Sequence, residues 1–266
     1  MIRGVMLTAV ALATGLFVNS ALTPNAAQLL QASWEKPHVV GHRGAAAYQP
    51  ENTLASFREA VKIGADATEC DVHLSQDGVP FILHDATLDR TTRLKGRIDQ
   101  TESATLIQAG VPTLEETILA LKNKIVFVIE IKAGEGVEAK VTELIKKHGT
   151  AAQTIAFSFN QAIVARVEQL MPELPTVWLQ GPKPTVETTP TIMAQAKSLG
   201  IDAIGVSYKS LEPEFAETLR AAHVPLFVWT VPPGPEVERL KGLRVNFIIT
   251  DHPRDVLPLL GRKPTG

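Results

Sequence analysis

The stretch from residue 69 to residue 85, ECDVHLSQDGVPFILHD, places two acids and a histidine within two apolar runs. Glu69 and Asp71 stand two residues apart in the first run, and side chains at that spacing point to the same face of a strand. Burying carboxylates on one face costs free energy unless they bind a cation. The pattern therefore predicts a metal site with oxygen ligands.

A second apolar run ends in the same way, because Glu130 and Lys132 follow each other in IEIK at 129–132. Clustered carboxylates raise one another's pKa, and a divalent cation removes that conflict. Ligation by oxygen alone favours Ca²⁺ or Mg²⁺ over zinc. We therefore expect Glu69, Asp71 and Glu130 to bind Ca²⁺ or Mg²⁺. The alternative is that Glu130 and Lys132 only pair with each other in the wall of the fold.

Two histidines are placed to converge on these acids. His42 and Arg43 stand in GHRG at 41–44, between glycines that allow close backbone approach, and His84 ends the second apolar run of the opening stretch. A histidine pair can remove one proton and deliver another during phosphoryl transfer. Arg43 and Lys132 can donate hydrogen bonds to a phosphate. We therefore predict His42 and His84 as catalytic residues and Arg43 and Lys132 as substrate-binding residues.

Three further residues have predicted places near this site. Glu51, in PENT at 50–53, either suits the dipole of the helix that follows or is a partner of Arg43 or of a water bound to the metal. Trp229 is expected to line the substrate pocket. Cys70 is the only cysteine, so an intrachain disulfide is excluded. Strand alternation should turn its thiol away from the two acids that flank it and toward covering helices.

The elements that must position these residues alternate along the chain. Short runs rich in Val, Ile and Phe alternate with segments of helical period, which indicates parallel βαβ units. A capping box at Thr113 and Glu116 marks one helix start. The expected strands cover nine ranges: 38–42, 67–74, 79–84, 125–131, 154–159, 176–180, 202–207, 225–231 and 245–250.

Nine strands are one too many for an eightfold barrel, and the turn signal Asp77-Gly78 explains the excess. A two-residue turn there makes 79–84 return antiparallel to 67–74, pairs Gln76 with Val79 and places His84 opposite Asp71. The other eight strands predict an α/β fold, a (β/α)8 TIM barrel with an added β-hairpin after the second strand. Its active site would lie at the carboxyl ends of the strands. The alternative is an open doubly wound sheet.

Composition and the N-terminus complete the expectations. The 266 residues include 45% hydrophobic and 20% charged residues with a net charge of −2, so nothing indicates nucleic-acid binding. Arg3 followed by the apolar residues 4–18 predicts a signal peptide over 1–27, cleaved somewhere between 20 and 27. We therefore expect an exported protein, periplasmic or secreted, with no membrane span after processing. The alternative is an uncleaved leader that acts as a membrane anchor.

The series GHRG, PENT, ECDVHLSQDGVPFILHD, LDRTT, PTLEE, EIK, VWTV and ITDHP resembles the glycerophosphodiester phosphodiesterase family from about Val39 to Pro253. The resemblance implies a TIM-barrel domain over 36–262 and a divalent ion, usually Ca²⁺ or Mg²⁺. It also implies hydrolysis of glycerophosphodiesters to sn-glycerol 3-phosphate and an alcohol. In this chain the positions that match the family's functional residues are Glu69, Asp71 and Glu130 for the metal, His42 and His84 for catalysis, and Arg43 and Lys132 near the phosphate.

One region departs from the family, because the segment inserted after the hairpin is only about 94–111 here and carries no readable motif. Substrate size therefore stays open. One alternative is lysophospholipase D-type cleavage of lysophospholipids at the same site, which exposed apolar loops near the site would favour. Another is a non-catalytic phosphodiester-binding protein, which the loss of a histidine or an acid would have favoured; all five are present.

Overall fold

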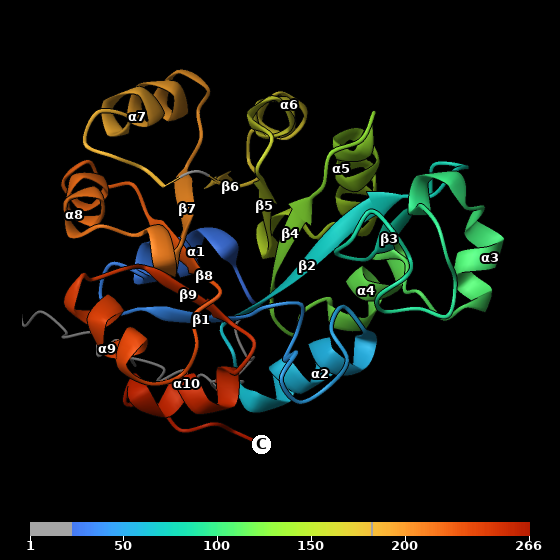
Figure 1. Cartoon of the computed structure of the whole chain (residues 1–266), viewed down its shortest axis with the longest axis horizontal. Coiled ribbons are helices and arrows are strands. Elements are labelled where there is room, and N and C mark those ends of the chain that lie inside the picture. Colours follow the sequence, from blue (N-terminus) through green and yellow to red (C-terminus); the bar gives the residue numbers. More distant parts are fainter. Residues whose placement is uncertain (1–22, 182) are drawn as a thin grey trace, which may run out of the picture.

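Eight parallel strands close into a barrel in the computed structural model, which describes residues 23–181 and 183–266 (Figure 1). Most of the predicted leader, residues 1–22, lies outside the described residues. Neighbouring strands follow chain order, and pairing of β1 with β2 closes the ring. The barrel strands are β1 (His38–Gly41), β2 (Ala67–Leu74), β4 (Val126–Ile131), β5 (Thr154–Ser158), β6 (Thr176–Gln180), β7 (Ala203–Ser207), β8 (Leu226–Trp229) and β9 (Phe247–Thr250). The predicted barrel is confirmed, and the open sheet is wrong.

Helices connect the strands and form the outer layer (Figure 1). Thr113 caps α4 (Leu114–Leu121), and the Glu116 side chain accepts a hydrogen bond from the Thr113 N–H, which confirms the predicted capping box. The segment around α3 (Ser103–Gln108) lies beside the added strand β3 (Pro80–Ile82), outside the ring of helices (Figure 1). The connecting helices are α2 (Leu54–Ile63), α4 (Leu114–Leu121), α5 (Val137–His148), α6 (Gln161–Leu170), α7 (Thr189–Ser198), α8 (Pro213–Ala221) and α9 (Pro235–Gly242), and α10 (Pro253–Leu259) follows β9.

Apolar side chains fill the interior of the barrel on the side away from the carboxyl ends of the strands. Phe227 and Phe247 stack with ring centroids 3.9 Å apart, and Phe157 meets Phe227 edge to face. The helix α1 (Ala26–Ala32) packs Leu29 and the fully buried Ala26 against this cluster. Each large buried side chain stabilises the fold by about 1.5–3 kcal/mol. This end of the barrel is therefore filled by apolar side chains, whereas the acids gather at the opposite end.

The hairpin differs from its predicted register by one residue. The strand β3 (Pro80–Ile82) pairs Leu74 with Pro80 and Val72 with Ile82. Ser75 donates its N–H to Val79 O at 2.9 Å, and Gly78 has a φ of 80°, so the loop has three residues with a left-handed glycine at its end.

The predicted pairing of His84 with Asp71 is therefore wrong. Leu83 lies opposite Asp71, to whose carbonyl it donates its N–H at 3.0 Å. Because β3 ends at Ile82, His84 follows the strand and its direction is set by the loop rather than by the ladder.

Cys70 is buried among helix-layer side chains such as Phe57 and Ile118, as strand alternation requires. Burial also raises the pKa of its thiol well above the usual range. We predict that Cys70→Val keeps kcat and changes the free energy of unfolding by less than about 1.5 kcal/mol. Steady-state kinetics and denaturant unfolding, run beside Glu69→Ala, check this. A folded Cys70→Val as inactive as Glu69→Ala would contradict it.

Candidate active site

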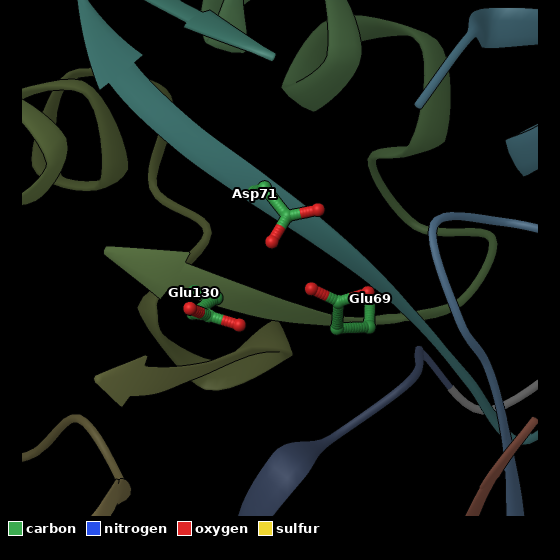
Figure 2. Close-up of side chains that lie close together, drawn as sticks. All are labelled: Glu69, Asp71 and Glu130. Carbon is green, nitrogen blue, oxygen red and sulfur yellow. The ribbon is translucent and has the colours of Figure 1, made fainter. Parts of the chain in front are cut away.

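Three carboxylates meet at the carboxyl ends of two neighbouring strands. Glu69 and Asp71 come from β2 and Glu130 from β4, where Asp71 and Glu130 are direct partners in the ladder. One oxygen of each carboxylate lies within 4.8 Å of the other two. Figure 2 shows the three groups turned toward the same space. All three side chains are buried. The structure thus brings together the acids that the sequence singled out.

The cluster fits a hard divalent cation. Glu69 Oε1 is buried and has no hydrogen-bond partner among the described residues, whereas Glu69 Oε2 accepts the Arg43 N–H at 2.8 Å. Burial, with repulsion from Asp71 and Glu130, raises the pKa of Glu69 well above its usual range. Burial and Asp71 also raise the pKa of Glu130. An orphaned carboxylate oxygen in an all-oxygen donor set is what such a cation would satisfy.

Two basic side chains and one amide side chain contact the acids. Lys132 Nζ lies 2.7 Å from Asp71 Oδ1 and 2.5 Å from Glu130 Oε1. Arg43 Nε lies 3.4 Å from Asp71 Oδ2, to which Asn52 donates at 2.8 Å. Burial alone would raise the pKa of Asp71, but Lys132 and Arg43 outweigh it and lower that pKa. Glu130 and Lys132 do pair, but Lys132 also contacts Asp71, so the lysine belongs to the acid cluster.

A tight loop after β1 fixes the predicted histidine and arginine. A Cβ on Gly41 would lie 2.2 Å from Gly44 O, and a Cβ on Gly44, whose φ is 93°, would lie 2.2 Å from Ser56 Oγ. Arg43 itself has a φ of 51°, a strained conformation for a side-chain-bearing residue. Strain of this kind costs on the order of 1–3 kcal/mol. The glycines therefore let the chain turn so sharply that His42 and Arg43 face the acids.

Each predicted catalytic histidine has a carboxylate on its Nδ1. His42 Nδ1 lies 2.7 Å from Asp251 Oδ1, and His84 Nδ1 lies 2.7 Å from Asp85 Oδ1. An ionised carboxylate only accepts hydrogen bonds, so Nδ1 carries the proton and Nε2 is left for chemistry. Burial lowers the pKa of His84, against the opposing pull of Asp71 and Asp85. Sequence reasoning missed both acids, although they stand in the motifs HD and ITDHP.

A third histidine was also missed. His73 continues the series of Glu69 and Asp71 along β2, and its Nε2 lies 3.1 Å from His84 O. A carbonyl accepts, so Nε2 is the donor. His73 thus holds the main chain of His84 at a point beyond the end of β3. The same two-residue spacing that singled out the acids could have found it.

A cavity of about 120 Å³ joins these groups. One side is polar and carries both histidines and two of the acids. The other side is apolar and includes Trp229, the residue expected to line the pocket, and Phe159, which was not predicted and is 45% exposed. Their rings meet edge to face at 5.4 Å. The lining residues are His42, Arg43, Glu69, His84, Glu130, Phe157, Phe159, Leu179, Trp229, Thr230 and Ile249.

Glu51 lies before α2, whose N-cap is Thr53, so it does not belong to the first turn of that helix. Its Oε1 accepts a hydrogen bond from Arg43 Nη1 at 2.8 Å. Of the two interpretations of Glu51, contact with Arg43 is the one that the structure shows.

Residues 42–255 match the model of the glycerophosphoryl diester phosphodiesterase family. The chain belongs to this family. A glycerophosphodiester phosphodiesterase of Caldanaerobacter subterraneus is 34% identical over 85% of this chain and 98% of its own length. One from Bacillus subtilis is 31% identical over 80% and 83%. A phosphodiesterase of Oleispira antarctica, solved with its product sn-glycerol-3-phosphate, is 26% identical, with a TM-score of 0.78 over 85% of this chain and 97% of that chain.

A divalent cation that binds this acid cluster should release protons. The raised pKa of Glu69 and Glu130 means that these carboxyls hold protons to higher pH than usual, and only their ionised forms ligate. Affinity should therefore fall as pH falls, with more protons released per ion at low pH. Calorimetric titration with Ca²⁺ or Mg²⁺ in buffers of different ionisation enthalpy measures the number released.

The matched variant for this titration is Glu69→Gln, which keeps the size of the side chain and cannot ionise. It should bind the cation more weakly and release fewer protons. Equal enthalpies in all buffers across the pH range would contradict the raised pKa values.

Proposed function

We propose that this protein hydrolyses glycerophosphodiesters to sn-glycerol 3-phosphate and an alcohol, with Ca²⁺ or Mg²⁺ held by Glu69, Asp71 and Glu130. The observation that carries the proposal is one cavity lined by two histidines, each with a carboxylate on Nδ1, and by acids of the cluster. The names of the two bacterial relatives and the product bound by the Oleispira antarctica phosphodiesterase support it.

Charge favours a phosphodiester once a cation is present. Two basic side chains, Arg43 and Lys132, face three carboxylates, which leaves one net negative charge on the ionised cluster. A divalent cation reverses that sign and, when bound, withdraws electron density from the phosphate. Arg43 can donate to a phosphate oxygen in the cavity that it lines.

The histidines carry the two proton transfers. Hydrolysis breaks the bond from phosphorus to the alcohol oxygen and forms one to an oxygen from water, so one proton leaves the nucleophile and one reaches the alcohol. Asp251 and Asp85 hold His42 and His84 with Nε2 available for these transfers. Trp229 and Phe159 supply an apolar wall for the carbon skeleton of the substrate.

Lysophospholipids are a second substrate class for the same chemistry. The observation that favours them is Phe159, an aromatic ring 45% exposed beside the cavity that could contact an acyl chain. Within residues 23–181 and 183–266, no helix has the length and hydropathy needed to cross a membrane.

The assay that tests the function compares glycerophosphocholine, glycerophosphoethanolamine and lysophosphatidylcholine, each with and without chelator. We expect turnover of the first two substrates, its loss on chelation and its recovery with Ca²⁺ or Mg²⁺.

Glu69→Ala should lose tight metal binding, because it removes the carboxylate whose Oε1 has no hydrogen-bond partner among the described residues. Full turnover after exhaustive chelation would contradict the metal requirement, and preference for lysophosphatidylcholine would replace the first substrate class with the second.

Substitution of the histidines tests their roles. His42→Ala and His84→Ala should each lower kcat by about 10²–10⁴-fold while metal binding stays largely intact. The double variant should be hardly slower than either single one, because residues that act as a unit are not additive. His148, which pairs with Glu115 at the end of α5, provides the control His148→Ala with unchanged kcat. Near-normal turnover by His84→Ala would contradict the proposal.

We further propose export, with the leader cleaved before Asn25. Asn25 caps α1 by accepting the Gln28 N–H at 3.0 Å, and Ala26 is fully buried at the base of the barrel. Cleavage after Ala27 would remove this cap and buried residue, so the earlier small residues of the predicted interval are favoured. N-terminal sequencing of exported protein should find a first residue between 21 and 25. Membrane-bound protein that retains Met1 would indicate the uncleaved anchor instead.

A further inference from the structure

We propose that Arg90 is a positioning residue that locks His84 and Arg43 into one charged network at the mouth of the cavity. The inference rests on the proposed function, because it concerns groups that act on the phosphodiester. Arg90 stands in the LDRTT motif, and it does not itself line the catalytic cavity. Its effect must therefore pass through the side chains that it contacts.

Arg90 binds two carboxylates at once through four hydrogen bonds. Its Nε and Nη2 donate to Asp85 Oδ2 and Oδ1 at 2.7 and 3.1 Å. Its Nη1 and Nη2 donate to Glu51 Oε2 and Oε1 at 2.7 and 2.8 Å. Exposed ion pairs usually contribute little to stability, and Arg90 is half-exposed, so we expect the network to add little to the stability of the fold. Its role is instead to orient side chains, because forked pairing of a guanidinium with carboxylates fixes their geometry.

One oxygen of each carboxylate also binds a side chain that lines the cavity. Asp85 Oδ1 also accepts from His84 Nδ1, and Glu51 Oε1 also accepts from Arg43 Nη1. Cationic and anionic side chains therefore alternate from Arg43 through Glu51 and Arg90 to Asp85, which holds the His84 imidazole. Arg43 and His84, at the two ends of this network, line the cavity.

Apart from Arg90 and His84 itself, no residue in the described part of the chain forms a hydrogen bond with the Asp85 carboxylate. The strand β3 ends at Ile82, so no ladder reaches Asp85, and His73 bonds only to the main chain of His84. The Arg90 bonds are the largest cause of the lowered pKa of Asp85 and Glu51, so both stay ionised acceptors. Without Arg90 the Asp85 side chain could turn into solvent, and His84 would lose the partner that fixes its tautomer.

The loop that carries Arg90 is held without it. Leu88 donates its N–H to Gly96 O at 2.9 Å, and Thr87 forms a bridge with Arg97. Leu88 and Ile98 are buried in a small cluster with Phe81 and Leu106. Removing the Arg90 side chain should therefore leave the loop folded.

The experiment compares Arg90→Ala, Arg90→Lys and the control Arg97→Ala. Arg97 lies in the same loop and forks onto Asp99 with hydrogen bonds of 2.8 and 2.5 Å, away from the network. Arg90→Ala should lower kcat about 10–100-fold, the loss typical when a residue behind a catalytic group is removed. Arg90→Lys should resemble Arg90→Ala, because an ammonium cannot fork onto both carboxylates. Arg97→Ala should keep kcat.

Nitrogen NMR of the histidine rings is the deciding readout, because it needs no turnover and stays informative even if the proposed substrate is not cleaved. In the wild type His84 should be the Nδ1–H tautomer, and in both Arg90 variants it should become a mixture while His42 stays unchanged. An unchanged His84 tautomer in a folded Arg90→Lys overturns the proposal, whatever happens to kcat. If Arg90→Ala unfolds, Arg90→Lys alone decides.

Discussion

Burial of three carboxylates within a few ångströms of one another is the constraint on which the rest of the site depends. Each acid repels the others, and buried carboxylates are little screened by solvent because the dielectric constant inside the barrel is low. Three neighbours stabilise the ionised Asp71 carboxylate: Lys132, Arg43 from the loop after β1, and the amide of Asn52. The strained backbone of Arg43 is tolerated because its own N–H binds Glu69. Glu69 Oε1 still has no hydrogen-bond donor among the described residues, and a cation fits there.

The two histidines are subject to a different constraint, because an imidazole that transfers protons through Nε2 must hold its other proton on Nδ1. Carboxylates on both Nδ1 atoms do this from separate elements, Asp251 after β9 and Asp85 after β3. The barrel brings these segments to one end because all its strands run the same way. The hairpin adds what the ring alone lacks, a chain that returns over β2 and presents His84 from outside the eight strands.

Inside the barrel, apolar packing and charge lie at opposite ends. Stacked phenylalanines and α1 fill the end of the barrel opposite the acid cluster. The other end carries charge, strained backbone and a partly exposed aromatic pair. Apolar packing of the helices against the barrel, together with the stacked phenylalanines, offsets the free-energy cost of the reactive site.

By itself the sequence determined the barrel, the added hairpin, the acid cluster and the outward turn of Cys70. Those features depend on local period: alternation along β2, apolar runs between helices and the Asp77-Gly78 turn. Tertiary structure alone decided that Asp251 meets His42, because 209 residues separate the two. It also decided the hairpin register, since one glycine in the left-handed region lengthened the loop to three residues and moved Leu83 opposite Asp71. Position beyond a strand's end is set by long-range contacts such as that of His73 with His84, which no local pattern records.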